Sequence, residues 1–226
     1  MSKTKNEPLL DAIEINPNQP AAASLIWLHG LGASGDDFVP VAEELQQLTQ
    51  LPLRFVFPHA PHRPVTINMG FVMPAWYDVS SFDKNAEIDH EGIAISVEQV
   101  KALIQAEQVK GFSPRQIILA GFSQGAVIVL NTLLSEPAEL GGVIALSGYL
   151  PPRKLLFHPQ QTPIFIGHGL SDEMVPCIYG QAAYETLKKA GYTVAWKTYH
   201  MTHSVCDQEI RDLAGWLKRI LGPAQA

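Results

Sequence analysis

The sequence predicts an α/β fold in which a mainly parallel central sheet is flanked by helices on both faces. One observation behind this prediction is an alternation of short, apolar, β-rich runs with longer segments of helical periodicity. Another is a junction at residues 116–125, where an apolar run passes through Gly-Phe-Ser-Gln-Gly into a segment that reads as helix. In addition, the 226 residues contain no linker and no internal repeat, which predicts a single domain over residues 1–226.

Six runs have the length and composition of buried strands. They are Ser24–Leu28, Leu53–Phe57, Gln116–Ala120, Gly142–Leu146, Pro163–Gly167 and Thr193–Tyr199. Helices are expected between them, and two have clear apolar spacing. The first covers about residues 88–108 and carries Ile93, Val97, Val100 and Ile104. The second is the last helix, which ends at Gly222-Pro223 and carries Ile210, Leu213, Ala214, Leu217 and Ile220.

Two connections between these elements differ in length. The segment from residue 58 to about residue 87 is long, and four prolines exclude a continuous helix there, namely Pro58, Pro61, Pro64 and Pro74. It is also too apolar for disorder, so a functional role is expected. By contrast, the connection from Leu146 to Pro163 is short. No lid domain is therefore expected, and the site should be open.

Composition bounds the classes of function. A hydrophobic content of 46% and a charged content of 17% describe a globular chain, and a net charge of −6 without a Lys/Arg run argues against a nucleic-acid partner. No run of about 18 apolar residues is present, so no integral membrane segment is expected. The first residues lack the apolar segment of a signal peptide, and Cys177 and Cys206 are expected to be free thiols. Both features favour a cytoplasmic location.

The junction Gly121–Gly125 has the Gly-x-Ser-x-Gly pattern of a nucleophile elbow. The turn is so tight that a side chain at Gly121 or Gly125 would collide with neighbouring backbone. It projects the Ser123 hydroxyl outward at the N-terminus of a helix. Ser123 is therefore the candidate nucleophile.

A serine hydroxyl becomes a good nucleophile when a neutral imidazole takes its proton and a carboxylate orients that imidazole. In folds with the elbow, the order along the chain is Ser, then Asp or Glu, then His. Asp172 and His203 each follow an expected strand, in loops beyond its carboxyl end, where open α/β sheets place their ligands. Glu173 and His200 are alternatives, and position alone does not separate His200 from His203.

The tetrahedral intermediate also needs hydrogen-bond donors for its oxyanion. The elbow supplies the backbone N–H of Gln124, directly after the nucleophile. The second donor should come from the loop His29–Gly32 after the first expected strand, whose glycines let the backbone turn an N–H inward. Leu31 is the expected donor in that loop.

Two further motifs suggest other chemistry. Residues 30–35 read Gly-x-Gly-x-x-Gly, but a dinucleotide site would also need an acid near the end of the next strand, and that strand has none. His200, His203 and Cys206 have metal-ligand spacing, with Asp207 as a further ligand. Since His203 is better explained by the triad and Cys206 by packing under the last helix, neither a metal nor an organic cofactor is expected.

Together the motifs resemble those of the carboxylesterase/acyl-protein thioesterase branch of the α/β-hydrolases, the lysophospholipase-like small esterases. The resemblance runs over nearly the whole chain. The segments that carry it are Leu28-His29-Gly30-Leu31-Gly32, Arg63-Pro64-Val65-Thr66-Ile67-Asn68, Met73-Pro74-Ala75-Trp76-Tyr77-Asp78, Gly121-Phe122-Ser123-Gln124-Gly125 and the loop of His203.

This resemblance implies an α/β-hydrolase fold and a serine hydrolase that cleaves carboxylic esters or thioesters through an acyl-enzyme. It implies Ser123, Asp172 and His203 as the triad, and Leu31 and Gln124 as the oxyanion donors. The expected activity is that of a carboxylesterase on short to medium acyl chains. The alternative is a lysophospholipase or acyl-protein thioesterase on long chains, and a more remote one is a catalytically silent binding protein.

The family pattern also favours His203 over His200, because the catalytic His follows a Met and a Gly. This chain has Thr202 in place of that Gly, and a β-branched residue would be strained there if the position required a positive φ. A second departure is Ala126, where many members have Gly.

The resemblance further implies that residues 63–78 line an acyl groove. The candidate substrate-binding residues are Met69, Met73, Trp76 and Val175. The expected substrate is a small-molecule, lipid or acylated-protein ester or thioester. Exposed apolar residues between positions 65 and 77 could instead serve a homodimer.

Overall fold

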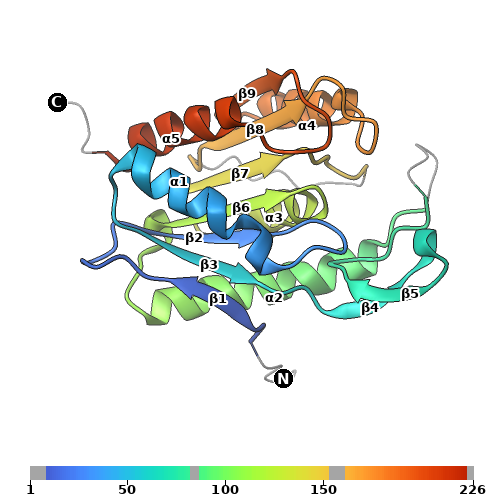
Figure 1. Ribbon diagram of the computed structural model, residues 1–226, viewed down its shortest axis with the longest axis horizontal. Coiled ribbons are helices and arrows are strands. Elements are labelled where there is room, and N and C mark those ends of the chain that lie inside the picture. Colours follow the sequence, from blue (N-terminus) through green and yellow to red (C-terminus); the bar gives the residue numbers. More distant parts are fainter. Residues whose placement is uncertain (1–8, 82–86, 153–160, 223–226) are drawn as a thin grey trace.

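The computed structural model describes residues 9–81, 87–152 and 161–222, and its centre is a seven-stranded sheet (Figure 1). The strand order is β1-β3-β2-β6-β7-β8-β9. In chain order the bounds are β1 Ala12–Ile15, β2 Ala23–Leu28, β3 Leu53–Pro58, β6 Ile117–Phe122, β7 Gly142–Leu146, β8 Ile164–Gly169 and β9 Val194–Tyr199. Strand β1 pairs antiparallel with β3, and all other pairs are parallel. The predicted α/β fold with a mainly parallel sheet is confirmed.

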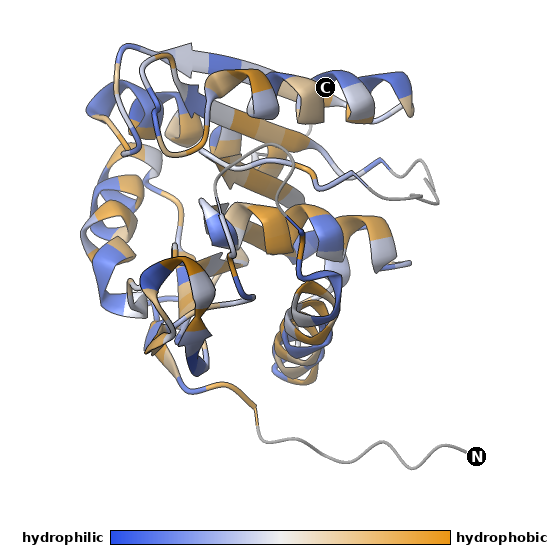
Figure 2. Ribbon diagram, turned by 90° about the vertical axis from the view of Figure 1, so that its right-hand side faces the viewer, coloured by the Kyte–Doolittle hydropathy of each residue, from blue (hydrophilic) through white to orange (hydrophobic). Residues whose placement is uncertain are grey.

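Helices cover both faces of this sheet, as predicted. Their bounds are α1 Val39–Thr49, α2 His90–Val109, α3 Gln124–Ser135, α4 Cys177–Lys189 and α5 Asp207–Leu221, with short 3₁₀ helices at Gly35–Phe38, Thr66–Asn68 and Pro114–Gln116. Helices α1 and α5 lie on one face and α2, α3 and α4 on the other, each group packed on its own apolar core (Figure 1). The strands of the sheet are mostly hydrophobic, whereas hydrophobic and hydrophilic residues alternate along the helices (Figure 2).

All six expected strands are present, with ends that differ by at most two residues. Three strands were missed. Strand β1 is short and partly exposed at the sheet edge, so it lacks the continuous apolar run of a buried strand. Strands β4 (His62–Val65) and β5 (Phe71–Pro74) form a separate antiparallel hairpin within the proline-rich segment. Prolines are tolerated there because a two-stranded ribbon is all edge.

A buried ion pair fastens α2 to the sheet. The Glu107 carboxylate accepts hydrogen bonds from Arg54 Nε at 2.7 Å and from Ser24 Oγ at 2.6 Å, on β3 and β2 respectively. Burial alone would raise the pKa of Glu107, but these hydrogen bonds, with a third from Lys110, lower it to about 2. The helix is thereby held by a charge that stays ionised throughout the physiological range.

The parallel strands bring the expected catalytic loops to one edge. Leu28 of β2 is in register with Gly121 of β6, and Phe122 is in register with Leu146 of β7. The loops that follow β2, β6, β8 and β9 therefore leave the sheet at neighbouring points of the same rim, the right-hand side of Figure 1.

Some expectations fall outside the described residues. These concern the middle of the connection from β7 to β8, where no lid was expected, as well as the first eight residues and Pro223. Within the described residues, no helix is both long and apolar enough to cross a bilayer.

Candidate active site

Ser123 lies at the junction of β6 and α3, and its backbone conformation is unusual. Its φ of 55° and ψ of −115° are values that a residue with a side chain rarely adopts. The flanking glycines explain how the turn is tolerated. A Cβ on Gly121 would lie 2.3 Å from the carbonyl group of Gly125, and a Cβ on Gly125 would lie 2.4 Å from the carbonyl oxygen of Leu28. The steric reason inferred from the sequence for these two glycines agrees with this geometry.

Asp172 and His203 meet above the ends of β8 and β9. His203 Nδ1 lies 2.7 Å from Asp172 Oδ2, and the Asp172 side chain is fully buried whereas that of His203 is 18% exposed. A carboxylate accepts, so Nδ1 donates the proton, and Nε2 of a neutral imidazole is left as a base. Of the two histidines that position could not separate, His203 makes this contact, whereas His200 is exposed.

The Asp172 carboxylate is oriented by backbone groups of its own turn. Its Oδ1 accepts hydrogen bonds from the N–H of Met174 at 3.0 Å and of Val175 at 2.8 Å. Its Oδ2 is therefore free to face His203. The neighbouring Glu173 is exposed, so the structure distinguishes the two adjacent acids.

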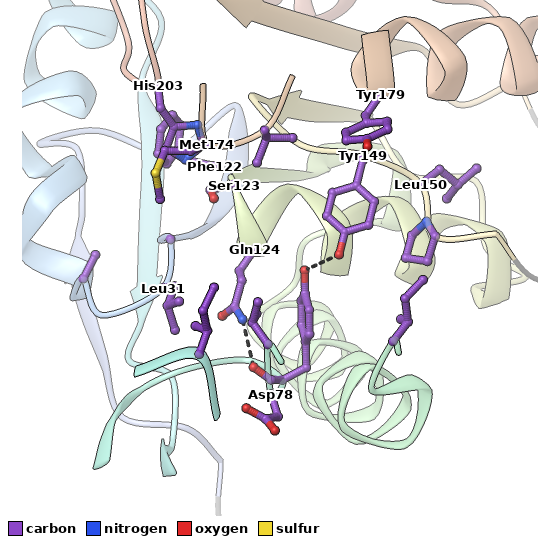
Figure 3. A pocket seen from close by; sticks show the side chains of 18 of the residues that line it. Leu31, Asp78, Phe122, Ser123, Gln124, Tyr149, Leu150, Met174, Tyr179 and His203 are labelled. Atoms are coloured by element: carbon purple, nitrogen blue, oxygen red, sulfur yellow. Dashed lines mark hydrogen bonds between the residues drawn. The ribbon is translucent and has the colours of Figure 1, made fainter. Parts of the chain in front are cut away.

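Ser123 and His203 line the same cleft (Figure 3). The ring of Phe122, directly before the nucleophile, packs on the His203 ring with 4.8 Å between centroids. No hydrogen bond joins the Ser123 hydroxyl to His203 among the described residues. Catalytic hydrogen bonds of this kind often tighten only when substrate is bound.

The loop after β2 packs against the elbow. A Cβ on Gly30 would lie 3.4 Å from Ser123 Cβ, so the backbone before Leu31 lies close to Ser123. Gly32 has a φ of 72° and donates its N–H to the carbonyl oxygen of Pro74 at 2.9 Å. On the opposite side, the N–H of Gln124 begins α3 and has no acceptor within the helix.

His29 fixes this loop from beneath, a role that sequence reasoning missed. Its Nδ1 donates to the carbonyl oxygen of Gly30 at 2.7 Å, and its Nε2 accepts from the N–H of Ala60 at 3.1 Å. Both ring nitrogens are satisfied in the neutral form, and burial lowers the pKa of His29. The Trp76 indole adds a hydrogen bond to the carbonyl oxygen of His29 at 2.8 Å.

The sequence analysis also missed the structural role of the Gln124 side chain. Its amide oxygen accepts from the N–H of Trp76 at 3.0 Å, and its amide nitrogen donates to the carbonyl oxygen of Tyr77 at 2.8 Å. Gln124 thus joins the elbow to the segment after β5. A sequence shows that a Gln follows the nucleophile but not which distant backbone it reaches.

The cleft has a volume of about 1110 Å³, at the upper end of the usual range for small-molecule sites. Figure 3 shows Leu31 and Met174 near Ser123, and Tyr149, Leu150 and Tyr179 farther along the cleft. The Tyr149 hydroxyl lies 3.2 Å from that of Tyr77 and helps to close one wall.

The four residues expected to bind substrate divide into two pairs. Met73 and Val175 line the cleft. Met69 does not, because it lies at the turn of the β4–β5 hairpin and is 90% exposed. Trp76 does not either, since it is fully buried and its indole is hydrogen-bonded to the carbonyl oxygen of His29. The structure thus places Met73 and Val175, but not Met69 and Trp76, on the cleft, because the sequence of an apolar segment does not show which way a hairpin or an indole turns.

Thr202 is not in the positive-φ region, so the strain considered for a β-branched residue there is absent. The described residues contain no group of three or more His, Cys, Asp or Glu side chains that could hold a metal ion. Cys177 and Cys206 are both free thiols.

Comparisons with known proteins agree on one family. The sequence profile of the phospholipase/carboxylesterase family matches residues 11–221. Acyl-protein thioesterase 1 of Cryptococcus neoformans is 37% identical over 235 residues, which covers 94% of this chain and 98% of that protein.

Two solved structures are similar as well. Carboxylesterase SOBER1 of Arabidopsis thaliana superposes with a TM-score of 0.82 at 36% identity, covering 88% of this chain and 99% of that one. Acyl-protein thioesterase 2 of Zea mays superposes with a TM-score of 0.80 at 27% identity, covering 94% and 99%.

Proposed function

The chain belongs to the phospholipase/carboxylesterase family of α/β-hydrolases and is an ester or thioester hydrolase, and we propose that Ser123, Asp172 and His203 carry out its reaction. The observation that carries this proposal is the 2.7 Å hydrogen bond from His203 Nδ1 to Asp172. It orients the imidazole in the cleft that Ser123 also lines, with Nε2 left as the base.

The first half of the reaction forms an acyl-enzyme. Ser123 Oγ attacks the carbonyl carbon of the substrate while His203 Nε2 takes the hydroxyl proton. The oxyanion of the tetrahedral intermediate accepts hydrogen bonds from the N–H groups of Leu31 and Gln124. The C–O or C–S bond then breaks, and His203 returns the proton to the leaving alcohol or thiol.

In the second half, water replaces the leaving group. His203 takes a proton from the water, which attacks the acyl carbon, and the same two N–H groups hold the new oxyanion. Breakdown of this intermediate returns the proton to Ser123 Oγ and releases the carboxylic acid. An imidazolium cannot accept a proton, so the rate should fall on the acid side of neutrality.

For the acyl group we propose a medium or long chain. Support comes from the size of the cleft and from its apolar wall, which includes Leu31, Met73 and Leu150. Relatives named acyl-protein thioesterase 1 make acylated proteins, along with lipid esters, a class of substrate to test first. We therefore favour the long-chain alternative over the short-to-medium-chain carboxylesterase that the sequence predicted.

The test is hydrolysis of p-nitrophenyl acetate, butyrate, octanoate and palmitate, and of a palmitoylated peptide thioester. Wild type should turn over the longer chains with the higher kcat/KM. Ser123→Ala should lose at least about 10³-fold in kcat on every substrate, because the variant lacks the hydroxyl that forms the acyl-enzyme. Thermal denaturation controls for folding.

Each outcome separates one part of the proposal. Full activity in folded Ser123→Ala would refute the nucleophile. A profile that peaks at acetate would refute the chain-length proposal and leave the triad standing. A wild type that shows no turnover and is not labelled at Ser123 by a fluorophosphonate would favour the silent binding protein, because such a protein lacks an activated serine.

We also propose a cytoplasmic location and a homodimer. The free thiols of Cys177 and Cys206 support a cytoplasmic location, where thiols stay reduced. The exposed Met69, Phe71 and Val72 on the β4–β5 hairpin support a homodimer. Sedimentation of wild type against Phe71→Ser would test the dimer, since a monomer in both would refute it.

A further inference from the structure

A second imidazole lies beside the Asp172–His203 pair. His168, in β8, is fully buried, and its Nε2 lies 3.5 Å from Asp172 Oδ2. The same oxygen accepts the 2.7 Å hydrogen bond from His203. The carboxylate therefore lies between two imidazoles, of which His203 reaches the cleft and His168 does not.

The contacts of His168 assign its tautomer. Its Nε2 lies 2.8 Å from the carbonyl oxygen of Val175, and because a carbonyl only accepts, Nε2 carries the proton. Its Nδ1 is buried and has no hydrogen-bond partner among the described residues, as suits a nitrogen without a proton. Burial lowers the pKa of His168, which favours the same neutral form.

The hydrogen bond from His168 completes the turn that presents the carboxylate. The N–H of Val175 donates to Asp172 Oδ1 at 2.8 Å, while the carbonyl oxygen of Val175 accepts from His168. Val175 is thus held on both sides of its backbone. A shift of Val175 would move both the carboxylate and the wall of the cleft.

Helix α4 has a glycine, Gly180, where it packs against the ring of His168. A Cβ on Gly180 would lie 2.2 Å from His168 Nδ1 and 3.0 Å from its Cε1. Glycine inside a helix costs about 1 kcal/mol relative to alanine, so this position favours alanine on local grounds. The imidazole of His168 accounts for the glycine.

We propose that His168 is a positioning residue for the catalytic carboxylate: by holding the turn 172–175 through its Nε2–H, it fixes Asp172 and thereby the ring of His203. This inference rests on the proposed triad. Cys177, at the start of α4, is a further titratable group near Asp172; burial first, and then Asp172, raise the pKa of its thiol. Cys177 is therefore a neutral neighbour.

The test compares two substitutions of similar size. His168→Leu fills the space without a donor, whereas His168→Gln keeps an N–H near Val175. We expect His168→Leu to lower kcat about 30-fold and to change KM less than about twofold. The loss in kcat should be well below the roughly 10⁴-fold loss expected when the carboxylate that orients the histidine is removed. We expect the acid limb of kcat/KM to move about half a pH unit lower, because a loosely held carboxylate stabilises the imidazolium less. His168→Gln should recover most of kcat and the position of the limb.

A third variant tests the idea if His168→Leu does not fold. Gly180→Ala leaves the histidine in place but pushes its ring, and it should lower kcat and move the acid limb in the same direction. Leu187→Ala, a buried change farther along α4, is the matched control. It should lower stability without moving the limb.

The outcomes are distinct. An unchanged kcat and acid limb in folded His168→Leu, or in folded Gly180→Ala, would overturn the inference. An equal loss in His168→Gln and His168→Leu would also overturn it, because the hydrogen bond would then not matter. If wild-type turnover did not depend on Ser123, the proposed function would fail instead.

Discussion

The nucleophile wall of the cleft, Gly121–Gly125, and the acid–base wall, residues 172–175 with His203, are held in place by different forces. Sterics dominate the first, since the positions of Gly121 and Gly125 have no room for a Cβ and Ser123 adopts a φ of 55°. Hydrogen bonds dominate the second, where Asp172 is held by two backbone N–H groups and by His203.

The difference has a physical consequence. A sterically defined turn contains no group that titrates, so its geometry should be the same at any pH at which the protein folds. A wall built on a carboxylate and imidazoles changes when protons move. Sensitivity to pH should therefore concentrate on the acid–base wall and on the elements beneath it.

The largest effect is expected for Asp172→Asn. The amide oxygen can keep the N–H groups of Met174 and Val175, which turns the NH₂ group toward His203 Nδ1. His203 would then carry its proton on Nε2 and could not accept one from Ser123. We expect kcat to fall about 10⁴-fold with the fold intact. A loss below about tenfold on p-nitrophenyl octanoate, with an unchanged Tm, would show that Asp172 does not orient the base.

The next effect concerns Glu209 and the pH dependence of the protein's stability. Glu209, in α5, is fully buried, neither carboxyl oxygen has a hydrogen-bond partner among the described residues, and one oxygen would lie 2.1 Å from a Cβ on Gly167 of β8. Burial, with a smaller contribution from Asp212, raises the pKa of Glu209 to about 8.

The sign of the effect follows from this raised pKa. Between pH 4.5 and about pH 8 the unfolded chain has lost the proton of Glu209 and the folded chain keeps it, so stability falls as pH rises through this window. Glu209→Gln lacks this loss. The difference in free energy of unfolding between Glu209→Gln and wild type, measured by urea denaturation, should therefore increase by roughly 3 kcal/mol from pH 5 to pH 8. A difference that stays constant over this range would contradict the raised pKa.

A steric substitution on the nucleophile wall should behave differently. In Gly125→Ala the new methyl group meets the carbonyl oxygens of Leu28 and His29 at 2.4 and 2.8 Å, and backbone cannot move away easily. We expect a loss of about 1–3 kcal/mol in stability, equal at pH 6 and pH 8, and a lower kcat.

The control for Gly125→Ala is Gly215→Ala in α5. Its new methyl group would have only the end of the Arg219 side chain nearby, at 3.8 Å. This change should be neutral or stabilising by up to about 1 kcal/mol. Equal effects of the two substitutions would refute the steric account of the elbow.

The smallest expected effect is a difference in kcat/KM between substitutions in the cleft and at the tip of the β4–β5 hairpin. Met73 lines the cleft whereas Met69 is 90% exposed. Met73→Ala should lower kcat/KM for p-nitrophenyl octanoate about 5-fold more than for the acetate, from the loss of about 1 kcal/mol of apolar contact. Met69→Ala should change neither. Equal losses on both esters in Met73→Ala would exclude a contact with the acyl chain.

Much of the fold and of the site could be predicted from local sequence. Strands β2, β3, β6, β7 and β8 consist mostly of buried, apolar residues because both faces of the sheet are covered there, and the edge strand β9 was recognised although it is only partly buried. The elbow is recognisable because its sterics lie within five consecutive residues. Local sequence did not reveal β1 or the β4–β5 hairpin, because β1 is a short, partly exposed edge strand and the hairpin is mostly exposed and contains two prolines.

What only the tertiary structure decided is which distant groups meet. Sequence order left His200 and His203 open, and the position of Asp172 across β8 and β9 selects His203. The tertiary structure also places Trp76 against the loop of His29, Met69 in solvent and His168 beside the Asp172 carboxylate. The chain by itself determined the sheet, the elbow and the candidate acids and bases, because these depend on neighbouring residues. Their partners depend on strand order and on side-chain direction, which arise when the sheet assembles.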